Sequence, residues 1–294
     1  MEHTDKGAVL ITGASSGIGK ACAGLFCKAG YRVFAGVRKD EDGESLRKEI
    51  SSQLSYIILD ICKSQDIADA LDTLTRTLEP HEGLQGIINN AGIVVGGPLE
   101  FLSPDDFRYQ IEVNLTGQLV VTQAFLPLIR RGHGRIIFVG SAEGRFAIPF
   151  SGAYAASKFG LEGLADALRR ELEPWHIAVI LVEPGTVNTP IWEKSLSAAD
   201  RRVAAMSTDA KRLYNKRGDA IKRVMKNGLK NAVSAHDVAQ LILTAMEREH
   251  PKARYQVGRD AYLAALSVFV PDRLKDWFMR NVIDEKLPSA MMGW

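Results

Sequence analysis

The feature that most constrains the fold of this chain is a regular alternation of short apolar runs with helix-length segments. The apolar runs occupy residues 8–12, 31–37, 56–59, 86–89, 135–139, 177–182 and 254–257. Strands that alternate with helices predict a parallel sheet covered on both faces, because each parallel strand needs a crossover connection. Right-handed crossovers then give an α/β fold with a doubly wound, Rossmann-like sheet of about seven strands.

A single domain is expected over residues 1–294, because the chain contains no linker, low-complexity segment or internal repeat. Residues 189–232 break the rhythm with a long, polar, helix-prone stretch. Ligands of such sheets bind at the carboxyl ends of the strands, so this stretch is a candidate substrate lid, the alternative being a passive surface excursion. Ser234 and Asp237 predict a capping box at the next helix. The C-terminal extension, residues 259–294, is expected to shield a pocket, a partner or a membrane surface, or to pack on its own domain.

Composition narrows the class of protein. A net charge of +2 gives no general attraction to polyanions, so no nucleic acid is expected as a partner. The three cysteines are an odd number without metal-ligand spacing and the histidines are scattered, so no metal site is expected. The longest apolar stretch near the end, residues 262–270, is too short for a transmembrane segment. No signal peptide is visible, and reduced thiols then indicate a cytoplasmic protein.

A glycine-rich loop follows the first apolar run and opens a helix. It reads Thr12-Gly13-Ala14-Ser15-Ser16-Gly17-Ile18-Gly19, a spacing that departs from the Gly-x-Gly-x-x-Gly form. Glycines let the backbone approach a pyrophosphate, and the helix N-terminus offers free N–H groups to that anion. The alternative is that these glycines serve packing alone. The loop therefore predicts a dinucleotide site contacted by Gly13, Ser15, Ser16, Gly17, Ile18 and Gly19.

The end of the second apolar run bears on the choice of dinucleotide. An acidic residue there would bond the ribose 2′-hydroxyl and repel a 2′-phosphate, but Val37 stands in that place and Arg38 follows. A guanidinium forms paired bonds with phosphate, so NADP(H) is the preferred cofactor and NAD(H) is the alternative. Later strand ends add expected cofactor contacts at Asp60, Ile61, Asn90, Ala91 and Gly92.

Tyr154 and Lys158 are four residues apart, which places both side chains on one face of a helix. A neighbouring ammonium favours the phenolate and is expected to lower the tyrosine pKa. Ser141 precedes this pair, directly after the fifth apolar run. Asn114 interrupts residues 104–130, which are expected to form one long helix bent at Pro127, and an interior asparagine that disagrees with helix preference suggests a functional site. These residues predict an acid/base centre beside the dinucleotide.

The ordered set of motifs resembles the short-chain dehydrogenase/reductase family. The matching pieces are Thr12 to Gly19, Asp60, Asn89 to Gly92, Asn114, Ser141, Tyr154 with Lys158, and Pro184-Gly185. The resemblance implies hydride transfer between a nicotinamide and a carbinol or carbonyl carbon. Within the family the pattern is most similar to the branch of 17-beta-hydroxysteroid and retinol dehydrogenases, through residues 35–38 and the long C-terminal extension.

The resemblance also implies roles for individual residues. Tyr154 is then the general acid in reduction and the general base in oxidation, while Lys158 lowers its pKa and holds the nicotinamide ribose. Ser141 donates a hydrogen bond to the substrate oxygen, and Asn114 anchors a water that links Lys158 to solvent. The turn after the sixth strand borders the nicotinamide through Pro184, Gly185, Val187 and Thr189.

The substrate end is expected to be apolar. Phe146, with Ser141 and Tyr154, is expected to contact a small hydrophobic alcohol or ketone of steroid-, retinoid- or lipid-like type. Further candidate pocket residues are Val94, Val95, Leu99, Ile148, Phe150, Trp192, Met206 and Tyr214. The alternatives are an NAD-dependent alcohol dehydrogenase of the same fold and a non-catalytic nucleotide-binding redox sensor. Because the family often pairs its long helices across a two-fold axis, a homodimer or homotetramer is expected.

Overall fold

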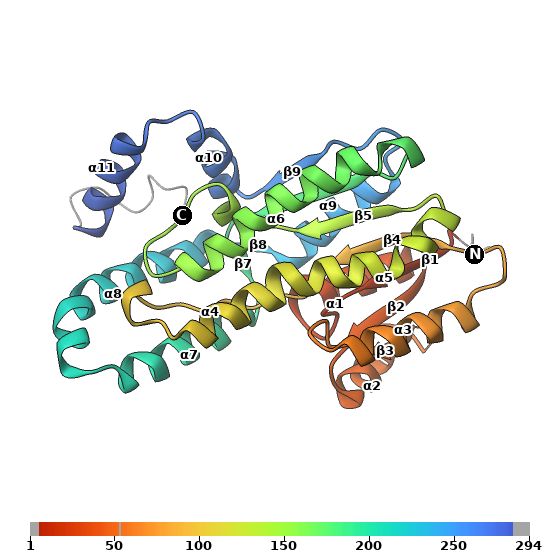
Figure 1. Cartoon of the computed structure of the whole chain (residues 1–294), viewed down its shortest axis with the longest axis horizontal. Helices are drawn as coiled ribbons and strands as arrows, with labels where there is room; N and C mark the ends of the chain where they lie inside the picture. The colour runs from red at the N-terminus through yellow and green to blue at the C-terminus, as the bar shows by residue number, and fades with distance from the viewer. Residues whose placement is uncertain (1–5, 53, 285–294) are drawn as a thin grey trace.

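The computed structural model describes residues 6–52 and 54–284, and a seven-stranded parallel sheet runs through its centre (Figure 1). The strand order, β3-β2-β1-β4-β5-β6-β9, confirms the doubly wound α/β fold. Each apolar run that the sequence singled out contributes one of these strands. They are β1 (Ala8–Ile11), β2 (Arg32–Val37), β3 (Ser55–Ile58), β4 (Leu84–Asn89), β5 (Arg135–Val139), β6 (Val179–Pro184) and β9 (Arg254–Val257).

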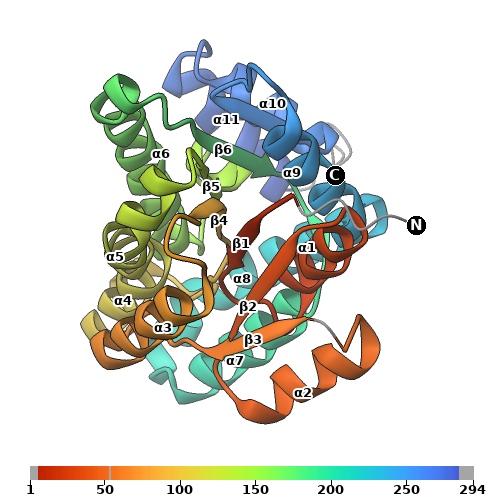
Figure 2. The same cartoon turned by 90° about the vertical axis from the view of Figure 1, so that its right-hand side faces the viewer.

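Alternate residues along the strands face two separate cores. Leu10 packs in one core, while its neighbours Val9 and Ile11 pack in the other, as the period of two in a strand requires. Helices lie on both sides of the sheet in Figure 2. Those on one face are α3 (Ser64–Thr77), α5 (Gly117–Arg131) and α6 (Gly152–Glu171), and those on the other are α1 (Gly17–Lys28), α2 (Asp40–Glu49) and α9 (Ala235–Glu247).

The expected long helix over residues 104–130 is interrupted at Asn114. α4 (Pro104–Ile111) begins after Ser103, whose hydroxyl accepts a hydrogen bond from the Asp106 backbone N–H. A π-helical turn, η2 (Glu112–Thr116), separates α4 from α5, and α5 continues through Pro127. The helical stretch therefore changes to a π-helical turn at the asparagine and continues as α-helix through the proline. Insertions of this kind are frequent at functional sites.

The stretch that breaks the strand rhythm forms two helices, α7 (Ile191–Ala205) and α8 (Thr208–Gly228), which lie together at one end of the molecule (Figure 1). The pair β7 (Val187–Asn188) and β8 (Val233–Ser234) closes the base of this excursion. The predicted capping box of Ser234 and Asp237 at the start of α9 is confirmed. Single-turn 3-10 helices occur at η1 (Leu99–Phe101), η3 (Ala142–Gly144), η4 (Glu173–Trp175) and η5 (Leu229–Asn231).

The C-terminal extension is described as far as residue 284, and its residues 285–294 lie outside the described part. It contains α10 (Arg259–Ser267) and α11 (Asp272–Ile283). A third core cluster joins α8 and α11 to the loop after β5, through Ile148, Ile221 and Val282. Helix α11 therefore packs against α8 and the loop after β5, whereas α10 lies against η3 and β9.

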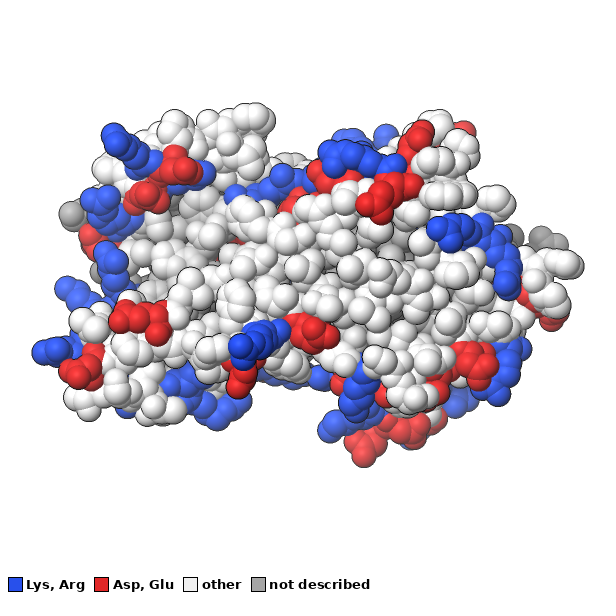
Figure 3. All heavy atoms as spheres, viewed as in Figure 1, with Lys and Arg blue, Asp and Glu red and all other residues white. Residues whose placement is uncertain are grey.

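The surface in Figure 3 carries acidic and basic groups at both ends and has a largely uncharged band between them. None of the described helices is both long and apolar enough to cross a bilayer. Among the described residues, no group of three or more histidine, cysteine, aspartate or glutamate side chains is arranged to hold a metal ion.

Candidate active site

A cleft of about 850 Å³ opens at the carboxyl ends of the central strands. This volume falls within the range that holds organic ligands, and the position is where open α/β sheets bind them. Of the residues predicted to contact the cofactor or to form the acid/base centre, together with Phe146, all but Gly19 line it. The predicted residues of this group that line it are Gly13, Ser15, Ser16, Gly17, Ile18, Arg38, Asp60, Ile61, Asn90, Ala91, Gly92, Asn114, Ser141, Phe146, Tyr154, Lys158, Pro184, Gly185, Val187 and Thr189.

The glycine loop is fixed by hydrogen bonds to the end of β4. Thr12 Oγ1 accepts from the backbone N–H groups of Asn90 and Ala91, each at 3.0 Å. Asn90 Nδ2 donates to the carbonyls of Thr12 and Gly13 at 2.9 and 3.1 Å. Asn90 thus braces the loop with its side chain, and Gly19, the one predicted cofactor contact that does not line the cleft, packs against the same amide.

Two features of the loop require glycine at position 13. Its φ is +62°, a conformation that costs other residues free energy, and a Cβ atom there would lie 2.9 Å from the Ala91 Cα. α1 starts immediately after the loop, and the side chain of its N-cap residue, Ser16, makes no cap hydrogen bond. The free N–H groups and the positive dipole end therefore face the cleft, as binding of a pyrophosphate requires.

Where the cleft reaches the end of β2, a basic residue lines it and no acidic residue stands at the strand end. Val37 and Arg38 line the cleft, and the Arg38 side chain is exposed. The nearest following acid, Asp40, begins α2 and accepts a hydrogen bond from the Tyr56 hydroxyl at 2.8 Å. Asp60 also lines the cleft, with Oδ1 accepting the Cys62 backbone N–H at 3.1 Å. The charged residue that lines the cleft at the end of β2 is therefore a cation.

Tyr154, Ser141 and Lys158 meet in the middle of the cleft. Ser141 and Tyr154 are joined by a side-chain hydrogen bond. Lys158 Nζ donates to the Val139 carbonyl at 2.7 Å and lies 5.7 Å from the centre of the Tyr154 ring. Helix α6 supplies the tyrosine and the lysine, and the end of β5 supplies the serine and the carbonyl. The predicted acid/base residues are therefore brought together.

The pKa of the Tyr154 hydroxyl is shifted in the opposite direction to the one expected from Lys158. Burial raises the pKa of Tyr154, the Glu143 carboxylate raises it further, and the Ser141 hydrogen bond lowers it. Burial also lowers the pKa of Lys158 to about 8, against the opposing charge of Glu162. The phenolate of Tyr154 and the ammonium of Lys158 would each lose hydration in this buried site. This loss affects the two pKa values more than the attraction between the two charges does.

Asn114 uses its side-chain amide to hold neighbouring backbone. Its Oδ1 accepts the Ile93 backbone N–H at 2.9 Å, and its Nδ2 donates to the Ile93 carbonyl at 3.0 Å and to Ser157 Oγ at 3.2 Å. It is fully buried and lines the cleft. Asn114 therefore ties η2 to the segment after β4 and to helix α6 beside Tyr154.

The turn after β6 is held by a residue of the C-terminal extension, which the sequence did not predict. Asp260, in the first turn of α10, accepts the Thr186 backbone N–H at 2.5 Å. A Cβ on Gly185 would overlap the Asp260 carboxylate, so the close approach requires glycine. Thr189 then reaches the glycine loop, where its Cγ2 would lie 3.2 Å from a Cβ on Gly17. The loop and the turn thus close over the same part of the cleft.

The apolar end of the cleft only partly matches the residues expected there. Val94, Val95, Phe146, Ile148 and Trp192 line it. The expected contacts Leu99, Phe150, Met206 and Tyr214 do not line it. Phe150, with φ +70°, packs edge-on against Tyr214 at 6.0 Å, and a Cβ on Gly152 would meet the Leu99 side chain at 2.6 Å. Those side chains serve packing around the cleft, the commoner fate of apolar residues.

Residues of the candidate lid and of the C-terminal extension complete the wall. α7 adds Ser195 and Arg202, and α10, α11 and the residues between them add an apolar set made of Leu263, Ala264, Val270, Leu274, Trp277 and Phe278. Glu143, buried beside Tyr154, accepts a short hydrogen bond from the Ser151 hydroxyl. Burial raises the pKa of Glu143 to about 7. Nothing in local periodicity marks these residues, because they reach the cleft only through packing.

Comparison with known proteins identifies close relatives. The family model described as short chain dehydrogenase matches residues 7–200. A 3-amino-tetrahydro-pyrrolizinone reductase from Xenorhabdus hominickii is 34% identical, covering 92% of this chain and 94% of the relative. Human 17-beta-hydroxysteroid dehydrogenase type 6 is 34% identical, with coverages of 95% and 89%. Mouse retinol dehydrogenase 16 is 32% identical, with coverages of 94% and 90%.

Solved structures share the fold at lower sequence identity. A short chain dehydrogenase from Burkholderia cenocepacia, in complex with NADP, superposes with a TM-score of 0.72 at 22% identity, covering 95% of this chain and 99% of that one. A 3-ketoacyl-(acyl-carrier-protein) reductase from Brucella melitensis, complexed with NADH, gives 0.69 at 22% identity, covering 86% and 97%. At this identity the likeness concerns the fold.

Proposed function

The chain belongs to the short-chain dehydrogenase family, and from that premise we propose that it transfers hydride between NADP(H) and an apolar alcohol or ketone. Its relatives are dehydrogenases and reductases, and oxidoreductase chemistry on a CH–OH group follows from membership. The single observation that carries the proposal is the meeting of Tyr154, Ser141 and Lys158 in the same cleft as the glycine loop.

The residues of the cleft fit a dinucleotide. The Gly13 backbone approaches Ala91 too closely for a side chain, the N-terminus of α1 is open, and Thr189 lies over Gly17. These groups would hold the pyrophosphate, Asp60 the adenosine and Lys158 the nicotinamide ribose. When bound, the nicotinamide would supply a hydride, which is one proton with two electrons, to the substrate carbon, or would remove it.

The protein's own residues handle the proton. In reduction the substrate oxygen gains negative charge, and the Tyr154 hydroxyl gives it a proton while Ser141 donates a hydrogen bond. The substrate thus gains a hydride at carbon and a proton at oxygen, and solvent returns the proton to Tyr154. The raised Tyr154 pKa keeps this hydroxyl protonated at neutral pH, which suits the acid role. Oxidation reverses each transfer.

Arg38 supports the choice of NADP(H). It is a cleft-lining cation next to a strand end without an acid, and Asp40 is already bonded by Tyr56. A guanidinium at this place favours a 2′-phosphate over a 2′-hydroxyl. NAD(H) is the competing outcome of the test below.

An apolar substrate is supported by the walls of the cleft. The loop after β5, helix α7 and the C-terminal helices contribute Ile148, Trp192, Leu263, Trp277 and Phe278. The polar groups Ser141, Glu143 and Tyr154 gather at the carbonyl position. This combination of apolar walls with few polar groups is typical of a site for a hydrophobic small molecule.

We also propose that the chain assembles through the outer faces of α4, α5 and α6. Phe107, Val120 and Phe159 are exposed on these three helices. Exposed apolar groups gathered on one face favour burial against a second copy. Sedimentation of the purified protein tests this, and a monomer across the concentration range would contradict it. The free thiols Cys22, Cys27 and Cys62 support a reducing, cytoplasmic location for that assembly.

The experiment that tests the function follows nicotinamide absorbance while a panel of apolar ketones and alcohols is offered with NADPH, NADH and their oxidised forms. Turnover of an apolar pair with the phosphorylated cofactor is expected. Tyr154→Phe removes the proton donor and should lower kcat about 100- to 10,000-fold. Tyr31→Phe, the same change next to Phe26 and outside the cleft lining, serves as the control. Full activity of Tyr154→Phe would overturn the acid/base assignment.

A further inference from the structure

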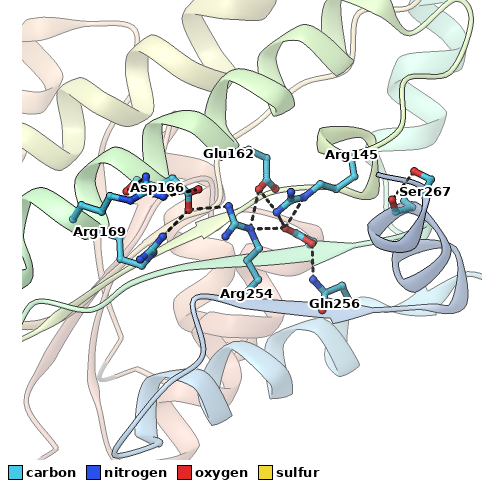
Figure 4. Close-up of polar contacts among 10 residues, drawn as sticks. Arg145, Glu162, Asp166, Arg169, Arg254, Gln256 and Ser267 are labelled. Atoms are coloured by element: carbon cyan, nitrogen blue, oxygen red, sulfur yellow. Dashed lines mark hydrogen bonds and ion pairs between the residues drawn. The ribbon is translucent and has the colours of Figure 1, made fainter. Parts of the chain in front are cut away.

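A cluster of buried charges lies directly behind the catalytic residues, and the mechanism above does not use it. Its centre is a pair of carboxylates, Glu162 and Glu183, which are 8% and 1% exposed. Arg145 Nη2 lies 2.7 Å from Glu162 Oε2 and 3.1 Å from Glu183 Oε1. Arg254 Nε lies 3.1 Å from Glu162 Oε2 and 3.3 Å from Glu183 Oε1. Both guanidinium groups therefore bridge the same two carboxylates, and Figure 4 shows Arg145 and Arg254 pointing toward Glu162.

Three of the four segments that meet in this cluster also carry residues of the proposed active site, and the fourth is β9. Arg145 follows Ser141 by four residues in the loop after β5, and Glu162 follows Lys158 by one turn of α6. Glu183 is in β6 immediately before the Pro184-Gly185 turn. From β9, Gln256 Nε2 donates to Glu183 Oε2 at 2.7 Å. The cluster thus connects the serine, the lysine and the turn through the face of the site that is away from the substrate.

Gly144 brings the serine loop directly onto the helix. A Cβ at this position would lie 3.1 Å from the Lys158 carbonyl oxygen and 3.2 Å from Glu162 Cγ. The loop backbone therefore crosses α6 at the turn between Lys158 and Glu162, and the next residue, Arg145, reaches the carboxylates. Displacement of Arg145 would release the loop that holds Ser141 beside Tyr154.

From this arrangement we propose that Glu162 is a positioning residue for Lys158 and Ser141, and that its carboxylate keeps the Lys158 side chain in its charged form. The inference rests on the proposed oxidoreductase function. Stability alone is a weak reason for such a cluster, because apolar residues often replace buried ion pairs without loss of stability. The position next to the catalytic lysine gives the cluster a role in the reaction instead.

The charges that face Glu162 come from every element packed against it. They are Arg145 from the loop after β5, Glu183 from β6, Arg254 from β9, and Lys158 and Asp166 from α6. Burial raises the pKa of Glu162 to about 7, the neighbouring Glu183 raises it as well, and the two arginines oppose this. Glu162 Oε1 has no hydrogen-bond partner among the described residues. The Glu162 carboxyl is therefore harder to ionise than an ordinary glutamate, and Lys158 is the proposed catalytic group that its charge would affect.

The test compares pH profiles of kcat/KM for wild type and Glu162→Gln, with the substrate and cofactor found in the absorbance screen. Below about pH 6 the wild-type carboxyl is neutral, so the two proteins should differ least there. Above pH 7 the wild-type carboxylate stabilises the charge on Lys158, so the variant should lose activity progressively as the pH rises. If the alkaline limb of its kcat/KM profile shifts down by about one pH unit, the loss should be about tenfold by pH 9. Glu171→Gln, the same change at an exposed position on α6, should keep the wild-type profile.

A second variant predicts a shift in the other direction. Glu183→Gln removes the neighbouring carboxylate that raises the Glu162 pKa, so Glu162 should ionise at lower pH. A merely structural role predicts a loss of activity that is the same at every pH. A parallel, pH-independent loss in Glu162→Gln, or an unchanged profile, would overturn the proposal.

A further test uses wild-type protein and so does not depend on whether Glu162→Gln or Glu183→Gln folds. Infrared titration should show a buried carboxyl losing its proton near pH 7, in addition to the signal that Glu143→Gln removes. Absence of that second signal would overturn the charge change at Glu162. Wild-type protein that binds no nicotinamide nucleotide and turns nothing over would contradict the proposed function instead, so the two failures are distinguishable.

Discussion

At the proposed nucleotide end of the cleft the wall is formed largely by backbone, whereas at the proposed substrate end it is formed by side chains from several separate segments. The glycine loop, the N-terminus of α1 and the turn after β4 form the first end. Helices α7, α10 and α11 and the loop after β5 form the second. The first end is built into the sheet and is expected to tolerate little change. The second end lies outside the sheet, so specificity can vary without disturbing the fold.

The largest effect is expected where backbone geometry leaves no freedom. Gly13→Ala forces a side chain into a left-handed conformation against Ala91, at a cost of about 1–3 kcal/mol. The dissociation constant of the nicotinamide nucleotide, measured by calorimetry, should rise about 5- to 150-fold. Gly24→Ala is the matched control, because a Cβ there has open space. If Gly13→Ala bound the nicotinamide nucleotide as tightly as wild type, the nucleotide end would not be the less tolerant of the two ends of the cleft.

The second largest effect is expected at Arg38, a residue of the nucleotide end that would contact the cofactor through its side chain rather than its backbone. Arg38→Asp should lower the affinity for NADPH about tenfold or more, because a hydrogen-bonded charge is lost and a like charge is introduced. Affinity for NADH should rise or stay the same. Lys39→Asp makes the same charge change at a residue that does not line the cleft, and it should have a much smaller effect. Equal loss of both cofactors in Arg38→Asp would contradict a 2′-phosphate contact.

The smallest effect is expected at the substrate end. Arg202 on α7 forms paired hydrogen bonds with Asp106 on α4, at 3.1 and 3.2 Å, and both side chains are partly exposed. Arg202→Gln should loosen α7 over the cleft and raise KM for an apolar substrate about two- to fivefold, in line with about 0.5–1 kcal/mol for such a pair. Arg201→Gln alters an exposed neighbour and should leave KM unchanged. An unaltered KM in Arg202→Gln would show that α7 is a passive surface excursion.

Asn114 shows how far local rules extend. Its conflict with helix preference correctly marks a special position, and the structure places a π-helical turn there. The sequence does not predict the π-helical turn itself, because the amide of Asn114 finds partners only after Ile93 and Ser157 pack beside it. Likewise Phe150 and Leu99 are apolar near the site but do not line the cleft, since apolar character alone does not fix which wall a residue joins.

The sequence by itself determined the order of strands and helices along the chain, and it predicted the glycine-rich end of the cleft and the residues proposed for the acid/base centre. Periodicity, glycine positions and the spacing of Tyr154 and Lys158 are properties of short stretches of chain, so they can be recognised without the fold. Only the tertiary structure decided that Asp260 holds the turn after β6, that Arg145 and Arg254 bridge Glu162 and Glu183, and that burial raises the Tyr154 pKa. Those outcomes depend on solvent exclusion and on distances between segments far apart in the chain, which no local pattern records.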